Sequence, residues 1–334
     1  MEQHRSGIPS FGPSGNPANV PTDGDAGELS FELVQATEAA ALACARLLGK
    51  GDPDRVSELA AESMRGALER SGLTGTVVVS PRHQTHLPPG TVIGGGARRV
   101  DLGFYPLEGA SQVARGHINS VSLLVAVEPG GFARLPDVTQ VERIVAGPAA
   151  RGAIDLDDSI ADNLRRIAFA HDVRVQDLTV AILERPRHKD LITEVAAAGA
   201  RIRTLEEGDF ASAVMAALPG SGIDAAIGTG DLQAALIAAC AVRCLGGEFL
   251  ARLLARNDQE LQVLGDEPSR VYGISDLAPA AEISVAITGV SGGPLLPGVR
   301  FGTGYAETTS LLMSSRHATV RRVTTRHHVV GEPS

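Results

Sequence analysis

Aromatic residues are scarce in this 334-residue chain, where they make up 3% of the sequence and tryptophan is absent. Proteins that hold single-stranded nucleic acids or carbohydrate polymers by stacking need aromatic platforms, so the composition argues against both classes. Basic residues are outnumbered as well, with 30 Lys and Arg against 39 Asp and Glu and a net charge of −9. A nucleic-acid partner is therefore not expected, because a phosphate backbone requires a basic surface. The one local basic excess, at 316–328, is better interpreted as a solvated strand edge than as a binding patch.

Cysteine is also rare. The three cysteines, Cys44, Cys240 and Cys244, provide neither a disulfide framework nor a metal-binding spacing. Cys240 and Cys244 lie on an apolar segment, which favours core packing and a reducing, cytoplasmic compartment. No apolar run approaches the roughly 18 residues that a membrane span needs, so no membrane association is predicted. The N-terminus lacks the basic-then-apolar order of a signal peptide.

Hydrophobic patterning predicts an α/β protein. Residues 1–28 are rich in Gly, Pro, Ser, Asn and Asp and are predicted to form a disordered tail, with order beginning at Leu29. From Val180 onward strands and helices alternate, which is typical of α/β units with buried strands. The expected helices cover 31–48, 55–71, 155–169, 188–198, 209–217 and 232–244, and the expected strands cover 76–79, 100–104, 121–127, 179–183, 200–205 and 223–228, before a strand-rich C-terminal part.

One stretch combines a buried strand with a polar turn. It is V-D-L-G-F-Y-P-L-E-G-A at 100–110, in which we expect the turn to be built on Pro106 and Gly109 and to hold Glu108 at the bend. Functional side chains often lie at such strand ends, because a rigid sheet orients the loop that follows.

This stretch and several others together resemble the class II fructose-1,6-bisphosphatases of bacteria. The matching segments fall in the family's order, at similar intervals, from about residue 30 to 324: F-E-L-V-Q-A-T-E-A-A-A-L-A (31–43), G-K-G-D (49–52), I-D-L-D-D-S-I-A-D-N-L-R (154–165), P-R-H (186–188), E-G-D (207–209), R-L-L-A-R (252–256), T-G-V-S-G-G-P-L-L-P-G-V (288–299) and E-T-T-S-L-L-M (307–313). The resemblance implies a two-domain, layered α/β/α/β/α sandwich around a sugar-phosphate cleft. Residues 29–155 with 285–330 would form the phosphatase-type domain, and 156–284 the sugar-phosphate-binding domain.

The catalytic positions of this family are mostly replaced. In the family, acidic residues bind Mg²⁺ or Mn²⁺ and activate the attacking water, with help from a threonine. The residues at those positions here are Ser57, Pro81, Thr85, Tyr105, Ala110 and Ala234, and Glu108 is the acidic ligand that survives. Clustered divalent cations need several carboxylate oxygens, which one glutamate cannot supply. The comparison therefore implies a lost metal shell, with Glu108 as a weak ligand at most.

The sugar-phosphate side of the family site is better kept. The resemblance assigns phosphate binding to Arg185 and Arg187, sugar-hydroxyl binding to Glu207 and Asp209, and further substrate contacts to Glu108 and Gly109. The planar fork of arginine suits phosphate, because it donates parallel hydrogen bonds. The structural alternatives are a surface ion pair for Arg187 and a helix cap for Asp209. Gln140 and Pro53 replace a tyrosine and a lysine of the family, which erodes its second phosphate site.

Two other patterns could indicate a ligand site, a pair of histidines and a glycine-containing turn. His83 and His86, with Glu108 nearby, could bind Zn²⁺, although an exposed loop with incidental histidines is the simpler interpretation. The G-T-G-D-L-Q segment at 228–233 lacks the third glycine of a dinucleotide turn, and a helix cap at Asp231 explains it.

Two functions follow from these observations. The first is a bisphosphatase-like protein that keeps a sugar-phosphate pocket but is catalytically impaired or inactive, and serves as a sensor, regulator or partner subunit. The alternative is an active, metal-dependent fructose-1,6-bisphosphatase of gluconeogenesis. Family resemblance also implies a homo-oligomer.

Overall fold

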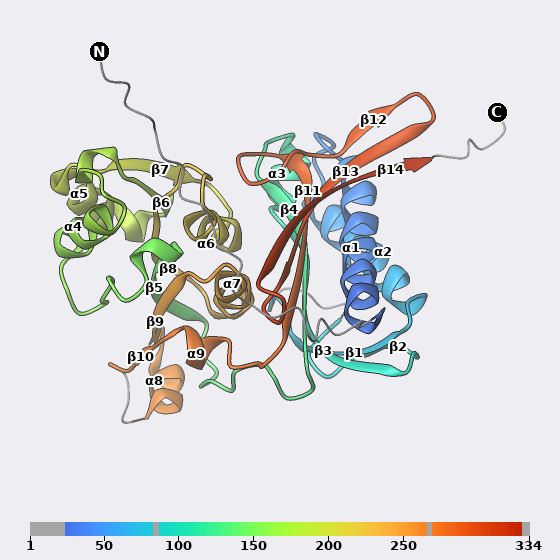
Figure 1. The fold of residues 1–334 in the computed structure, drawn as a ribbon, viewed down its shortest axis with the longest axis horizontal. Coiled ribbons are helices and arrows are strands. Elements are labelled where there is room, and N and C mark those ends of the chain that lie inside the picture. Colours follow the sequence, from blue (N-terminus) through green and yellow to red (C-terminus); the bar gives the residue numbers. More distant parts are fainter. Residues whose placement is uncertain (1–23, 83–86, 266–268, 329–334) are drawn as a thin grey trace, which may run out of the picture.

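The computed structural model describes residues 24–82, 87–265 and 269–328 of the chain. Two β-sheets and three helical layers alternate in it, with one pair of helices between the sheets and one pair on each outer face (Figure 1). The expected layered α/β/α/β/α sandwich is therefore confirmed. None of the described helices is both long and apolar enough to cross a membrane.

The larger sheet has eight strands. Its order is β12 (Arg300–Gly302), β13 (Tyr305–Ser314), β11 (Ile283–Gly292), β4 (Ser120–Val127), β3 (Arg98–Glu108), β1 (Leu73–Val79) and β2 (Val92–Gly94), and β14 (Thr319–His328) pairs with β13. Only β1 and β3 run parallel. Helices α1 (Gly24–Ala45) and α2 (Pro53–Glu69) cover the outer face of this sheet. Asp52 begins α2 by accepting the backbone N–H of Arg55 at 2.9 Å, and Pro53 supplies a first residue that needs no N–H partner.

The smaller sheet has six strands. Its order is β10 (Val271–Tyr272), β9 (Glu248–Leu254), β5 (Gln140–Ala146), β8 (Ala225–Asp231), β6 (Thr179–Leu183) and β7 (Arg201–Leu205). Helices α4 (Ile160–Ala170) and α5 (Lys189–Ala198) cover its outer face, and α6 (Asp209–Ala217) and α7 (Leu232–Cys244) lie between the two sheets (Figure 1). The shorter elements are α3 (Ala110–Arg115), α8 (Asp258–Leu264), α9 (Ile274–Leu277) and the 3₁₀ turns η1 (Pro148–Ala150), η2 (Val175–Asp177) and η3 (Pro186–His188).

Three apolar clusters join these layers. Phe104 packs with α1 and α2, Phe210 and Ile237 pack between the sheets, and Ile144 packs with α4 and α5. Helices α6 and α7 are apolar around almost their whole circumference, as a helix enclosed on both sides must be. Because α6 and α7 pack against both sheets, the first turn of α6 lies beside the end of β3 in the larger sheet.

Several element boundaries differ from expectation. Strand β3 continues through Pro106, so the turn expected there is wrong. The pairing of β3 with β4 shifts register between Tyr105 and Glu108, and such an irregularity tolerates a residue without an N–H. The helix expected from residue 155 begins at Ile160 instead, because Ser159 caps it by accepting the N–H of Asp162 at 3.1 Å.

The proposed division into two domains stays a prediction, but two observations bear on its limits. Strand β5 pairs with β8 and β9, so the second sheet already begins at Gln140, before residue 156. Helix α1 begins at Gly24, ahead of Leu29. Residues 1–23 of the expected tail lie outside the described residues.

Candidate functional site

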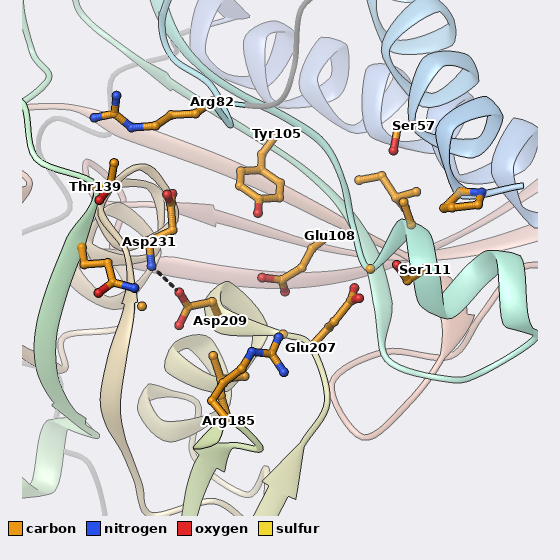
Figure 2. A pocket seen from close by; sticks show the side chains of 18 of the residues that line it. Ser57, Arg82, Tyr105, Glu108, Ser111, Thr139, Arg185, Glu207, Asp209 and Asp231 are labelled. Atoms are coloured by element: carbon orange, nitrogen blue, oxygen red, sulfur yellow. Dashed lines mark hydrogen bonds between the residues drawn. The ribbon is translucent and has the colours of Figure 1, made fainter. Parts of the chain in front are cut away.

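A cavity of about 650 Å³ opens where the end of β3, the first turn of α6 and the facing ends of β5 and β8 meet (Figure 2). A pocket of this volume accommodates a small ligand such as a sugar phosphate. The polar residues that line it are Asp54, Ser57, Arg82, Tyr105, Glu108, Ser111, Thr139, Gln140, Arg185, Arg187, Glu207, Asp209, Asp231 and Arg256.

Glu108 lies at the floor of the cavity with 4% of its surface exposed. Its two carboxylate oxygens accept the backbone N–H groups of Phe210 at 2.7 Å and Ala211 at 3.0 Å, which are the first free donors of α6. The next residue, Gly109, has a φ of 89°, and a Cβ there would lie 2.6 Å from Oγ of Ser120. Glycine is therefore required at this position, because a larger residue would be strained at this φ and would clash with Ser120. The turn at Gly109 leaves Glu108 facing α6.

Burial governs the acid–base properties of this floor. It raises the pKa of Glu108 to about 7 from an ordinary 4.5, although the two N–H donors act in the opposite direction. Burial also raises the pKa of Tyr105 above its usual range, with a further contribution from the nearby Glu108 carboxylate. Tyr105 is thus a neutral phenol that points toward the cavity (Figure 2).

Asp209 is fixed from two sides. One oxygen pairs with the guanidinium of Arg143, a residue only 4% exposed, and the other accepts the backbone N–H of Asp231 at 2.9 Å (Figure 2). Gly230 makes room for this carboxylate, since a Cβ at that position would lie 2.1 Å from it. Asp209 is therefore held in one orientation beside the cavity.

Arginines line the wall next to Asp209. Arg187 donates from Nε to Oγ1 of Thr229 at 2.5 Å and from its terminal nitrogen to the Thr229 carbonyl at 3.0 Å. Burial lowers the pKa of Arg187, and the charges of Arg185 and Arg256 lower it further. Among the described residues, none of these three arginines has a carboxylate partner at ion-pair distance. Arg185 and Arg187 thus form a positively charged wall beside Asp209, which suits an anionic ligand.

The structure brings most of the predicted site residues to this cavity. Its lining includes Ser57, Tyr105, Glu108, Gly109, Ala110, Arg185, Arg187, Glu207 and Asp209, and also Pro53 and Gln140. Pro81 and Ala234 do not line it: both are buried, and the N–H of Ala234 is capped by Asp231 at 3.0 Å. The cap predicted for Asp231 is thus confirmed, although Asp231 also lines the cavity. Thr85, His83 and His86 lie outside the described residues.

Sequence reasoning missed several lining residues: Asp54, Arg82, Ser111, Thr139 and Arg256. Arg82, Thr139 and Arg256 lie in loops next to a described strand, and Asp54 and Ser111 lie in the first turns of α2 and α3. That position was a usable signal, but apart from Arg256, which ends the R-L-L-A-R segment, no local motif marked these residues.

The donor set does not fit a cluster of divalent cations. In the part of the chain that the structure describes, no group of three or more His, Cys, Asp and Glu side chains is arranged to hold a metal ion. Glu108, Asp209 and Asp231 direct oxygens to N–H donors of the protein rather than to a shared point. Two clustered cations require several converging carboxylate oxygens.

Comparisons with known proteins agree with this architecture. The model of the family described as bacterial fructose-1,6-bisphosphatase, glpX-encoded, matches residues 27–327. Two proteins named D-fructose 1,6-bisphosphatase class 2/sedoheptulose 1,7-bisphosphatase, from Synechococcus sp. strains JA-2-3B'a(2-13) and JA-3-3Ab, are each 33% identical to the chain, over 91% of it and 97% of their own length. A protein of the same name from Synechococcus elongatus is 32% identical, over 90% of the chain and 96% of its own length. The chain belongs to the class II fructose-1,6-bisphosphatase family of bacteria.

Proposed function

We propose that this protein binds a sugar phosphate in the cavity, has little or no metal-dependent phosphatase activity, and acts as a sensor, regulator or partner subunit. The observation that carries the proposal is the bonding of the carboxylates. Glu108, Asp209 and Asp231 all accept N–H donors from the protein itself. The lone pairs that these bonds occupy are not available to a cation, so a metal cluster would have to use the remaining ones or leave buried N–H groups unpaired, at a cost of about 1–3 kcal/mol for each group.

The binding side of the cavity supports a phosphorylated ligand. Arg185 and Arg187 line one wall, and Thr229 holds Arg187 by two hydrogen bonds without neutralising its charge. Glu207 and the fixed Asp209 lie beside this wall and can accept hydrogen bonds from sugar hydroxyl groups (Figure 2). Fructose 1,6-bisphosphate or a related sugar phosphate is the proposed ligand.

Family membership favours a second candidate, an active metal-dependent fructose-1,6-bisphosphatase. The relatives that carry this name align with nearly the whole chain. On this alternative, Glu108 would have to release its bonds to α6 in order to hold a metal ion together with other side chains of the cavity.

Phosphate release from fructose 1,6-bisphosphate with Mn²⁺ or Mg²⁺ tests the two candidates. We expect wild-type protein to release no more phosphate than a Glu108→Gln variant, and Mn²⁺ to leave its melting temperature unchanged. Turnover that is present in the wild type and lost in the variant would establish the alternative. Calorimetric titration with the same sugar, on wild type and Arg187→Gln, tests binding separately. The cytoplasmic location and a homo-oligomeric state stay predictions.

A further inference from the structure

One end of the cavity contains an arrangement that the family resemblance does not assign. It is formed by Arg82, after β1, by Thr139, before β5, and by Arg256, after β9. Figure 2 shows Arg82 and Thr139 on the side of the cavity away from Arg185, with Glu108 and Asp209 between.

These three residues are held in place from outside the cavity. Arg82 donates to the Val138 carbonyl at 2.9 Å and to the exposed Asp137 at 2.5 Å. The carboxylate of Glu260, which is 8% exposed, accepts the backbone N–H of Thr139 at 3.2 Å and of Arg256 at 2.8 Å. One buried carboxylate thus fixes the two backbones beside each other, with their side chains on the cavity lining.

The same residues retain unused hydrogen-bonding capacity. Oγ1 of Thr139 is buried and has no hydrogen-bond partner in the part of the chain that the structure describes. Among the described residues, the guanidinium of Arg256 makes no hydrogen bond or ion pair, and only one terminal nitrogen of Arg82 is engaged. A buried polar atom in a native protein normally has a partner, so an orphan hydroxyl on a lining shared with two guanidinium groups indicates a ligand with acceptor oxygens.

Charge at this end of the cavity supports the same conclusion. Arg256 is near enough to Arg187 for its charge to lower the pKa of that group, and the charge of Arg82 opposes the rise in the pKa of Asp231. Four guanidinium groups therefore line the cavity, while Asp209 and Asp231 already have N–H partners. Like charges brought together in a cleft favour a multiply charged anion.

We propose that Arg82, Thr139 and Arg256 form a second phosphate subsite, so that a bisphosphorylated sugar is held at both ends by arginines without a divalent metal. This inference rests on the proposed function, because the other phosphate occupies the wall of Arg185 and Arg187. Guanidinium groups supply positive charge and directed donors together, and neither depends on a metal ion.

Calorimetric titration in EDTA tests the subsite, with fructose 1,6-bisphosphate and fructose 6-phosphate as the two ligands. We expect the wild type to bind the bisphosphate at least tenfold more tightly, as one additional set of charged hydrogen bonds would give. Arg82→Gln and Arg256→Gln should each reduce this ratio, and the double variant should bring it near one. Arg151→Gln, which removes an exposed arginine away from the cavity, is the charge-matched control and should keep the wild-type ratio.

The outcomes separate this inference from the proposed function. Equal wild-type affinities for the two sugars, or a ratio that the double variant keeps, would overturn the second subsite while leaving a sugar-phosphate pocket that depends on Arg187. Absence of binding by either sugar would overturn both. A requirement for Mn²⁺ in bisphosphate binding would also overturn the subsite, because it would place the second phosphate on a metal. Circular dichroism on each variant confirms that the substitution of these exposed arginines leaves the fold intact.

Discussion

The carboxylate of Glu108 accepts the backbone N–H of Phe210 at 2.7 Å, and this bond joins the end of a strand in one sheet to the first turn of the helix that supports the other. When Glu108 is ionised, the helix N-terminus also gains a negative charge that complements its dipole. A residue that the sequence marks as a metal ligand is thereby a structural link between the two halves of the molecule, and the cavity is built around it.

The stability of the protein should depend on pH through Glu108. Its pKa is about 7 in the folded chain against an ordinary 4.5, so between these values the folded state keeps a proton that the unfolded state releases. The resulting stabilisation is complete below pH 4.5 and is lost as the pH rises through 7. Relative to Glu108→Gln, which does not titrate, the free energy of unfolding of the wild type should fall by roughly 2 kcal/mol between pH 5 and 8.

Urea denaturation at several pH values measures this difference. Glu184→Gln, which replaces an exposed glutamate outside the cavity, is the control and should run parallel to the wild type. Parallel curves for wild type and Glu108→Gln would show that Glu108 titrates alike in the two states, and would contradict the prediction.

A methyl group at position 230 should disturb Asp209. A Cβ there would lie 2.1 Å from the Asp209 carboxylate, which would have to leave the N–H of Asp231. We expect Gly230→Ala to lower the affinity for sugar phosphate at least tenfold and the free energy of unfolding by about 1–3 kcal/mol. Gly95→Ala is the matched control, because a Cβ at Gly95 meets no atom within 4 Å. Retention of wild-type affinity by Gly230→Ala would show that Asp209 does not need this position to hold the ligand.

The layers of this fold could be predicted from the sequence, but the hydrogen bonds that hold the site residues in place could not. Alternating apolar segments identify the buried strands, and the apolar circumference of α6 and α7 marks them as interior helices. The binding of Glu108 to α6 depends on contacts between residues about a hundred positions apart, which no local pattern encodes. Arg82, Thr139 and Arg256 were missed for the same reason. Thr139 and Arg256 lie together because β5 and β9 pair and Glu260 binds both backbones, and Arg82 reaches them through its bonds to Asp137 and the Val138 carbonyl.

The three cysteines should be chemically inert in the folded protein. All are buried, and burial raises the pKa of Cys44 and of Cys244 to about 12 and that of Cys240 further still. A thiol in this state is protonated at pH 8 and is shielded from reagents. Iodoacetamide at pH 8, followed by mass spectrometry, should modify none of the three in native protein and all three in guanidinium chloride. Rapid labelling of native Cys240 would show that α7 opens, which its place between the sheets does not allow.

Removing one partner of the Arg143–Asp209 ion pair should destabilise the protein, whereas replacing both partners with apolar side chains should lower its stability much less. Both residues are mostly buried, and within residues 24–82, 87–265 and 269–328 neither Nε nor one terminal nitrogen of Arg143 has a hydrogen-bond partner. Arg143→Met leaves the Asp209 carboxylate without its cation, so we expect a loss of about 3 kcal/mol in the free energy of unfolding.

The double variant Arg143→Met with Asp209→Leu removes both charges and should recover part of that loss. No buried charge then remains unpaired, and the cost that remains is the N–H of Asp231, which loses its acceptor. It should still fail to bind sugar phosphate, since Asp209 is absent. The exposed pair Arg165 and Asp162 provides the comparison, and Arg165→Met should change stability by less than about 1 kcal/mol. If the double variant were less stable than Arg143→Met alone, the pair would contribute packing and hydrogen bonds that apolar side chains cannot replace, and the coupling energy from the cycle would measure that contribution.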